Sequence, residues 1–110
     1  MPEKTATANA VITAEVASWP GVEVAPHRFG GVAFMVGRRE LGHLHGDRLA
    51  DLPLTRALRD ELLDAGRVEA HHVLPDSGWA SRRIRTEDDV RDVIELLRLQ
   101  YDRAMARRAS

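Results

Sequence analysis

The sequence contains no cysteine, which excludes disulfide bonds, iron–sulfur clusters, thiolate zinc sites and a cysteine nucleophile. Any metal ion must therefore be bound through nitrogen and oxygen atoms. Long apolar runs are missing as well: the first ten residues include Glu3 and Lys4, and neither a secretory signal nor a membrane span can be read further along. These absences predict a cytoplasmic protein with no membrane partner.

The chain also lacks an excess of charge of either sign. It has 16 Lys and Arg residues and 17 Asp and Glu residues, so the formal net charge is -1 and the chain as a whole does not attract nucleic acid. Arg82, Arg83 and Arg85 form a local basic cluster, but the acidic residues that follow are typical of a solvated helix face. We therefore expect a small-molecule ligand or substrate and no nucleic acid.

Apolar residues spaced three or four positions apart predict three helices. Asp51 and Pro53 suit the start of the second helix and Gly66 suits its end, because proline fits a first turn and glycine a C-terminal stop. Thr86 is placed to cap the third helix. The predicted helices occupy residues 5–18, 54–65 and 86–107, and residues 1–10 are expected to form a flexible N-terminal tail.

Strands are predicted where apolar residues alternate with polar ones or form short runs between glycine and proline. Gly37 and Arg38 fit the tight turn of one hairpin, and the segment 74–78, with its proline, aspartate and glycine, fits the turn of another. The order α-β-β-β-α-β-β-α predicts a single α+β domain over residues 11–108, with a mostly antiparallel sheet of about five strands packed with three helices. The predicted strands cover residues 22–26, 32–36, 39–45, 68–73 and 79–84.

Histidines are the residues most suited to chemistry in this chain. His43 and His45 are two positions apart on a predicted strand, so their rings share one face and their backbones lie about 6.5–7 Å apart, close enough to bind one metal ion or ligand. In the doublet His71–His72, adjacent strand residues point to opposite faces, and only one of them can join the same pocket. The apolar neighbours of His72 favour that residue.

Each candidate also has a purely structural interpretation. His43 and His45 can fix a sheet edge through hydrogen bonds without taking part in any reaction. Asp76 is an ordinary turn residue, although its carboxylate could also orient a histidine by accepting a ring N–H. Trp79 and Phe29 can line a pocket or fill the core, and core is the commoner place for a lone aromatic residue.

Several sequence blocks, taken together in order and spacing, resemble the fungal-luciferase-like domain family over about residues 15–102. In the fungal luciferases this domain is associated with oxygenation of a hydroxypyrone luciferin, without a dedicated organic cofactor, and with light emission. The resemblance therefore implies an oxidoreductase of the monooxygenase or luciferase type, with molecular oxygen as co-substrate. The blocks are Trp19-Pro20-Gly21-Val22, His27-Arg28-Phe29-Gly30-Gly31, Glu40-Leu41-Gly42-His43-Leu44-His45-Gly46, Asp51-Leu52-Pro53-Leu54, the run from His71 to Trp79, and Leu96-Leu97-Arg98-Leu99.

Two functions from different classes remain open at this point. In the first, His43, His45 and His72 line a pocket for a small enolic or phenolic substrate, and one of them removes its proton. The residues predicted to bind this substrate are His27, Arg28, Phe29, Asp76 and Trp79. In the second, the domain is a non-catalytic accessory module that binds a small ligand or a divalent metal ion, with His43 and His45 as the metal ligands.

Overall fold

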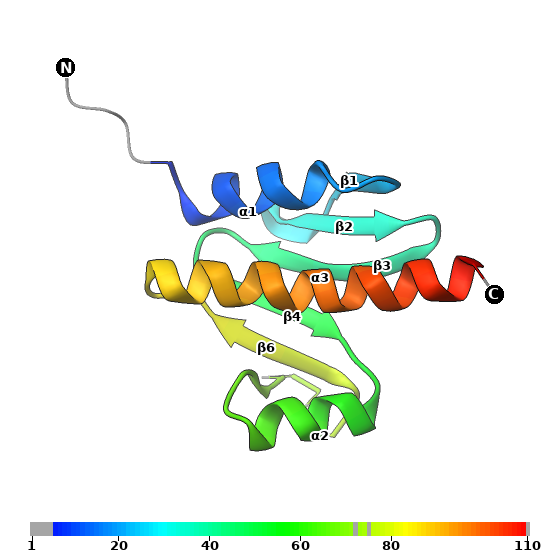
Figure 1. Cartoon of the computed structure of the whole chain (residues 1–110). Coiled ribbons are helices and arrows are strands. Elements are labelled where there is room, and N and C mark those ends of the chain that lie inside the picture. The colour runs from blue at the N-terminus through cyan, green and yellow to red at the C-terminus, as the bar shows by residue number, and fades with distance from the viewer. Residues whose placement is uncertain (1–5, 72, 75, 110) are drawn as a thin grey trace.

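The fold has two layers, in which three helices lie on one face of a six-stranded sheet (Figure 1). The computed structural model describes residues 6–71, 73–74 and 76–109, and for Phe29 the backbone alone. The helices are α1 (Ala8–Ala17), α2 (Arg56–Asp64) and α3 (Glu87–Ala109), with a short 3-10 helix η1 (Arg28–Gly30). The strands are β1 (Val22–Pro26), β2 (Val32–Val36), β3 (Arg39–His45), β4 (Leu49–Pro53), β5 (Glu69–Ala70) and β6 (Trp79–Arg83). The predicted α+β class is confirmed.

The sheet is antiparallel throughout, with the strand order β1-β2-β3-β4-β6-β5. It has six strands where the sequence predicted about five, because residues 49–53 pair as β4 with β3 and β6. The prediction that Asp51 and Pro53 begin a helix is therefore wrong. The helix starts later, after Thr55, whose side chain accepts the backbone N–H of Leu58 at 3.2 Å. Pro53 is tolerated in β4 because it is the last residue of the strand.

The strand predicted over residues 68–73 is shortened to the two residues of β5. The described ladder with β6 ends at Ala70. Directly after it, the ring Nδ1 of His71 accepts the backbone N–H groups of Val73 and Leu74, both at 3.1 Å, which are not bonds of a β ladder. The segment after β5 becomes a loop instead of a straight hairpin arm.

Two turns form as their glycines predict. Gly37, between β2 and β3, has φ +59°, and Gly66, after α2, has φ +72°. Both values lie in the left-handed region that glycine adopts without steric cost. Gly66 donates its N–H to Leu63 and Arg67 donates to Leu62, which satisfies the last carbonyl groups of α2.

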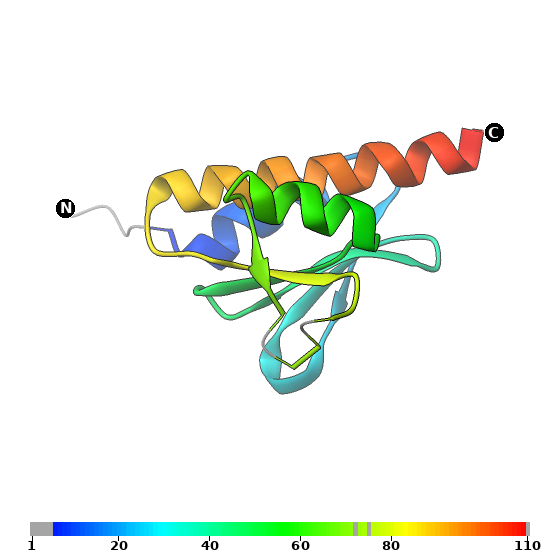
Figure 2. The same ribbon diagram turned by 90° about the horizontal axis from the view of Figure 1, so that it is seen from below.

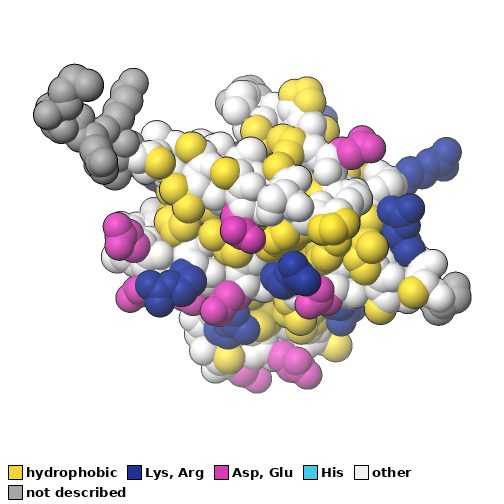
Figure 3. Space-filling view, turned by 45° about the horizontal axis from the view of Figure 1, so that its top comes forward, with side chains coloured by type: hydrophobic (Ala, Val, Ile, Leu, Met, Phe, Trp, Pro, Cys, Tyr) yellow, Lys and Arg dark blue, Asp and Glu magenta, His cyan; other side chains and the backbone are white. Residues whose placement is uncertain are grey.

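The hydrophobic core lies between the sheet and the helices. Among its fully buried side chains are Phe34 and Leu44 from the sheet, Leu97 from α3 and Ile12 from α1. Full burial of each such side chain contributes about 1.5–3 kcal/mol to folding. Figure 2 shows the helices gathered on one side of the sheet, and Figure 3 shows this helix side, on which no described histidine side chain is visible. Among the described helices, none combines the length and apolar character that a membrane span requires.

Two loops lie on the other side of the sheet, away from the helices (Figure 2). One connects β1 to β2 and carries His27 and η1, and the other connects β5 to β6 and carries His71. The outer face of the central strands β3, β4 and β6 faces these loops. Polar residues are therefore placed on a face that the helices do not cover.

Candidate functional site

A row of polar residues crosses the three central strands on the face away from the helices. In an antiparallel pair, residues directly opposite each other point to the same face. His43 of β3 is opposite Asp51 of β4, and Asp51 is opposite Ser81 of β6. His45 follows His43 by two positions and therefore shares this face. Strand register alone thus brings four polar side chains together.

Three imidazole rings surround the carboxylate of Asp51, and we call His43, His45, His71 and Asp51 the histidine–aspartate site. The Oδ2 atom of Asp51 lies 2.8 Å from Nε2 of His45, 3.3 Å from Nε2 of His71 and 3.4 Å from Nε2 of His43. Its other oxygen, Oδ1, accepts the hydroxyl of Ser81 at 2.6 Å. Asp51 is only 1% exposed, so these contacts replace the hydrogen bonds to water that the carboxylate loses on burial.

His43 is held on both sides of its ring. Its Nδ1 donates to Oε2 of Glu40 at 2.8 Å, and its Nε2 lies 3.1 Å from Nε2 of His45. The ring of His27 stacks on it at 3.9 Å between centroids, with 14° between the planes. The Nδ1 atom of His27 is buried and has no hydrogen-bond partner among the described residues. The ring of Trp79 lies 5.5 Å from that of His43 and 5.9 Å from that of His71.

The charges of the site shift the titration of its members. Burial acts to lower the pKa of His43, but hydrogen bonds to Asp51 and Glu40 outweigh it and raise this pKa to about 9. Burial acts to raise the pKa of Asp51, but hydrogen bonds from His43, Ser81 and His45 hold it well below its usual range. Burial, followed by the nearby positive charge on His43, lowers the pKa of His27. The site is therefore built around an ionised carboxylate and favours a cation beside it.

The hydrogen bonds of His71 define its tautomer. Because its Nδ1 accepts two backbone N–H groups, the neutral ring carries its proton on Nε2. Its Nε2 lies 3.3 Å from Oδ2 of Asp51. The contact of His71 with the carboxylate is therefore electrostatic, and it comes from the loop that lies over the sheet face.

The structure brings together some of the residues that the sequence singled out and leaves others apart. His43, His45, His27 and Trp79 lie at the site. Arg28 and Asp76 are exposed. The positive charge of Arg28 is a minor cause of the lowered pKa of His27, whereas Asp76 forms no ion pair with the described residues of the site. Of the doublet, the structure places His71 on Asp51, whereas the sequence favoured His72, which lies outside the described residues. The side chain of Phe29 lies outside them as well.

Asp51 and Ser81 are the site residues that sequence reasoning missed, whereas Glu40 was among the carboxylates expected to bond to these histidines. Asp51 was assigned to a helix start, which hid its role in a strand. It is nevertheless the one polar residue in the run Leu49-Ala50-Asp51-Leu52-Pro53-Leu54. A lone carboxylate inside an apolar run is buried only with partners, and that signal could have pointed to the histidines.

Two sets of three residues have ligand atoms that all lie within 4.8 Å of one another, as a metal ion requires. One set is His43, His45 and Asp51, and the other is His27, Glu40 and His43. Both use nitrogen and oxygen atoms alone, as the lack of cysteine demands. His43 and Asp51 are the buried members of the first set.

The fold and the site together define a small α+β domain with a histidine–carboxylate centre on the sheet face opposite its helices. The chain belongs to the Luciferase domain family, whose model matches residues 38–100. This segment includes the whole histidine–aspartate site, together with Glu40 and Ser81. The family resemblance seen in the sequence is confirmed. No curated protein and no solved structure matches the chain.

Proposed function

We propose that this domain is an oxidoreductase that oxygenates a small enolic or phenolic substrate at the histidine–aspartate site, with molecular oxygen as co-substrate. One observation carries the proposal: the Nε2 atoms of His43, His45 and His71 all lie within 3.4 Å of one carboxylate oxygen of Asp51. Imidazole and carboxylate groups are the side chains that most often exchange protons with a substrate. Membership of the Luciferase domain family supports the class of reaction.

The chemistry begins with the hydroxyl group of the substrate. Its proton passes to the imidazole–carboxylate group, and the resulting enolate or phenolate places electron density on a ring carbon. That carbon forms a bond to one atom of O2, with both bonding electrons supplied by the enolate. The second oxygen atom then carries the negative charge of the resulting peroxide and takes up a proton to give a hydroperoxide. Because the substrate supplies the electrons, the reaction needs no organic cofactor.

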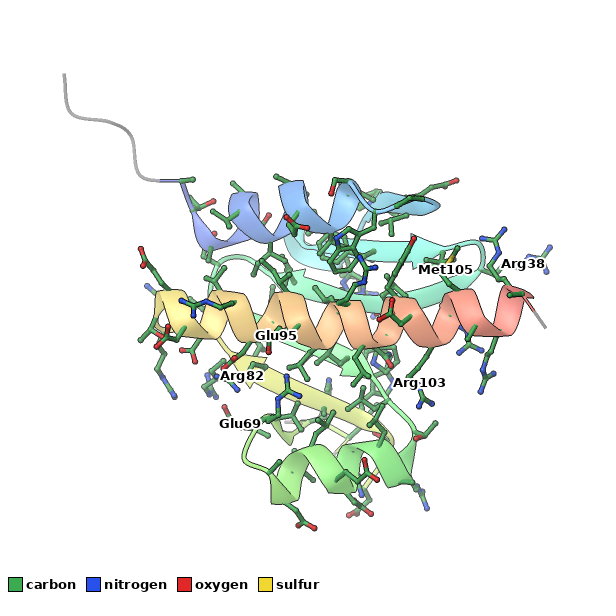
Figure 4. The ribbon with its side chains drawn as sticks, viewed as in Figure 1. Arg38, Glu69, Arg82, Glu95, Arg103 and Met105 are labelled. Carbon is green, nitrogen blue, oxygen red and sulfur yellow. The ribbon has the colours of Figure 1, made fainter. Side chains whose placement is uncertain are left out.

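A positively charged cleft beside the site supports an acidic substrate. The cleft has a volume of about 520 Å³ and lies at the end of the sheet, between the β2–β3 turn and the C-terminal half of α3. Its lining includes Arg38, Arg39 and Arg103, and none of these three forms an ion pair with a described carboxylate. Figure 4 shows Arg38 and Arg103 toward the same end of the molecule.

The cleft shares two residues with the surroundings of the site. Glu40 lines it and bonds to the ring of His43, while Trp79 lines it and contacts the rings of His43 and His71. A substrate lying in the cleft is therefore one side chain away from the imidazoles. Arginines along such a path favour an anionic group on the substrate. In this proposal, the arginines of the cleft bind the anionic group of the substrate, which is the role that the sequence predicted for Arg28.

The direct test is oxygen uptake by the purified protein with a panel of hydroxypyrones and other cyclic enols. We expect uptake with at least one of them, and its loss in His45→Ala with the far-ultraviolet circular dichroism spectrum unchanged. Asp64→Asn, an exposed change at the end of α2 on the helix side of the sheet, serves as the control and should keep full activity. Binding of these compounds without any oxygen uptake would instead favour the non-catalytic accessory module.

The charged cleft has its own test in a pair of α3 variants. Arg103→Met should raise KM for an acidic substrate several-fold and leave kcat nearly unchanged, because it removes binding energy remote from the reacting atoms. Arg98→Met is the matched control, because Arg98 pairs with Asp102 and does not line the cleft. Equal KM values in the two variants would exclude the cleft as part of the substrate path.

A further inference from the structure

We propose that the histidine–aspartate site binds one divalent transition-metal ion through Nε2 of His43, Nε2 of His45 and Oδ2 of Asp51. This inference rests on the same site as the proposed function and deepens it, because it names the group that would bring oxygen and the substrate together. Its test measures metal binding without substrate. Failure of the metal site and failure of the oxygenase are therefore separate results.

The three ligand atoms already have the spacing of a coordination sphere. They form a triangle with sides of 3.1 Å between the two nitrogens, 3.4 Å from His43 to Asp51 and 2.8 Å from His45 to Asp51. Ligand atoms about 2.1 Å from a metal ion lie about 3.0 Å apart at right angles and about 3.4 Å apart at the tetrahedral angle. The triangle matches one face of either geometry.

The three proposed ligand atoms converge on one point. Both Nε2 atoms face Oδ2 of Asp51, and they also face each other across 3.1 Å. Without a metal ion, hydrogen bonds to the ionised carboxylate hold the two rings in this arrangement. A metal ion bound by all three atoms would replace the protons of these hydrogen bonds.

The partners of the proposed ligands hold them in the orientation that a metal ion needs. The Nδ1–H group of His43 is fixed on Glu40 at 2.8 Å, which leaves Nε2 as the ligating atom. The second oxygen of Asp51 is held by Ser81 at 2.6 Å. Carboxylates on a ligating imidazole and donors on a ligating carboxylate are the usual outer partners of metal sites.

The position of its ring proton excludes His71 as a ligand. Its Nε2 carries a proton because its Nδ1 accepts the N–H groups of Val73 and Leu74. We therefore assign it as a positioning residue whose Nε2 lies 3.3 Å from Oδ2 of Asp51. The alternative set of His27, Glu40 and His43 would require Nδ1 of His43 to leave its bond to Glu40. The set with buried Asp51 keeps every described hydrogen bond of Glu40 and Ser81 in place.

The donor set also indicates which metals fit. Two imidazoles and one carboxylate, without thiolate, suit borderline divalent ions such as Fe²⁺ and Zn²⁺, and exclude a site built for soft Cu⁺. Two histidines and one carboxylate on one face, with open positions opposite, is the arrangement that iron oxygenases use to activate oxygen. This donor set therefore agrees with the oxygen chemistry of the proposed function.

The experiment is a calorimetric titration of the whole chain, stripped with a chelator, with Zn²⁺ and Co²⁺, and with Fe²⁺ under argon. We expect one equivalent of metal per chain and, for Co²⁺, visible absorption typical of nitrogen and oxygen ligands. Asp51→Asn and His45→Gln should each weaken binding by more than about 100-fold, the upper limit for loss of an outer partner. His45 is half-buried, so its variant remains informative if Asp51→Asn does not fold.

Three further variants sharpen the assignment. Glu40→Gln and His71→Gln should weaken binding by about 10-fold to 100-fold, because they remove outer partners and not ligands. Asp64→Asn makes the same chemical change as Asp51→Asn on an exposed residue of α2 and should bind metal like the unaltered protein. Absence of stoichiometric binding would overturn the proposal. So would equal affinities in Asp51→Asn and Asp64→Asn, or a larger loss in His71→Gln than in His45→Gln.

Discussion

The two faces of the central strands both carry buried side chains but differ completely in chemistry. On the helix face, Leu44 and Leu52 are 0% exposed and pack into the core. On the loop face, their neighbours His43 and Asp51 are 7% and 1% exposed and are surrounded by polar partners. The residues that hold the fold together and those proposed to act are therefore adjacent in the chain.

This difference shows how one strand serves two purposes. Side chains alternate between faces along β4 and along β3 from Gly42 to His45, so packing on one face sets the positions of polar groups on the other. The helix face gains stability from the area it removes from water, whereas each buried polar group on the loop face is tolerated only with its hydrogen bonds made. Substitutions on the two faces should therefore separate stability from ligand binding.

The largest effect is expected on the helix face. Leu52→Ala removes a fully buried side chain and should lower the free energy of unfolding by about 2–5 kcal/mol. Urea denaturation measures this loss. Below the unfolding transition the variant should still bind one metal ion, because Asp51 keeps its partners on the opposite face. Loss of metal binding in a variant that is still folded would show that the two faces are not independent.

A smaller effect on stability is expected on the loop face. Ser81→Ala removes the hydroxyl that donates to Oδ1 of buried Asp51 and should cost about 1–3 kcal/mol, because a buried carboxylate oxygen loses its partner. The same change should weaken metal binding, as loss of an outer partner does. Ser81→Thr keeps the hydroxyl and is the matched control. If the alanine variant changed stability alone, Ser81 would have only a structural role.

The smallest effect is expected outside both faces, at the start of α3. The Oδ1 atom of Asp89 accepts from Arg82 at 2.6 Å and its Oδ2 from the N–H of Arg85 at 2.8 Å, and these bonds lower its pKa from 3.8 to about 2. A lowered pKa stabilises the fold above pH 3.8, and this contribution is lost as the pH falls through about 2.

Asp89→Asn should therefore reduce stability by about 1 kcal/mol near neutral pH, because the group is partly exposed, and by less in acid. Thermal unfolding of both proteins at about pH 6 and about pH 2 measures the difference. The two melting temperatures should converge at the lower pH. A constant difference would mean that Asp89 acts through shape and not through its charge.

The sequence predicted most of the fold because local signals agree with the tertiary structure. Glycine at Gly37 and Gly66 marked two turns, and apolar spacing marked three helices. It failed at β4, because Asp51 and Pro53 also suit a helix start. Only pairing with β3 on one side and β6 on the other decides between the two, and that pairing is not local.

The site was predicted in part for the same reason. His43 and His45 share a face through a spacing of two, which is visible in the sequence. Asp51 joins them only through strand register, and His71 only through a bend that its own ring stabilises. Long-range pairing and a side-chain hydrogen bond to the backbone leave no periodic signal. Asp51 was marked only by being the lone carboxylate in an apolar run, and His71 by no local pattern.

Leu44 stands between His43 and His45 in β3 and points to the opposite face of the sheet. This alternation restricts how the strand can pair during folding. If β3 slipped by one residue against its neighbours, Leu44 would turn outward and the two imidazoles would have to be buried beneath α3. Such a mispaired chain would lose both its apolar contacts and the hydration of its rings, so it would not persist. Burial of Leu44 in the core therefore fixes the register of the two histidines. A chain that has reached its stable packing has its proposed ligands in the correct positions.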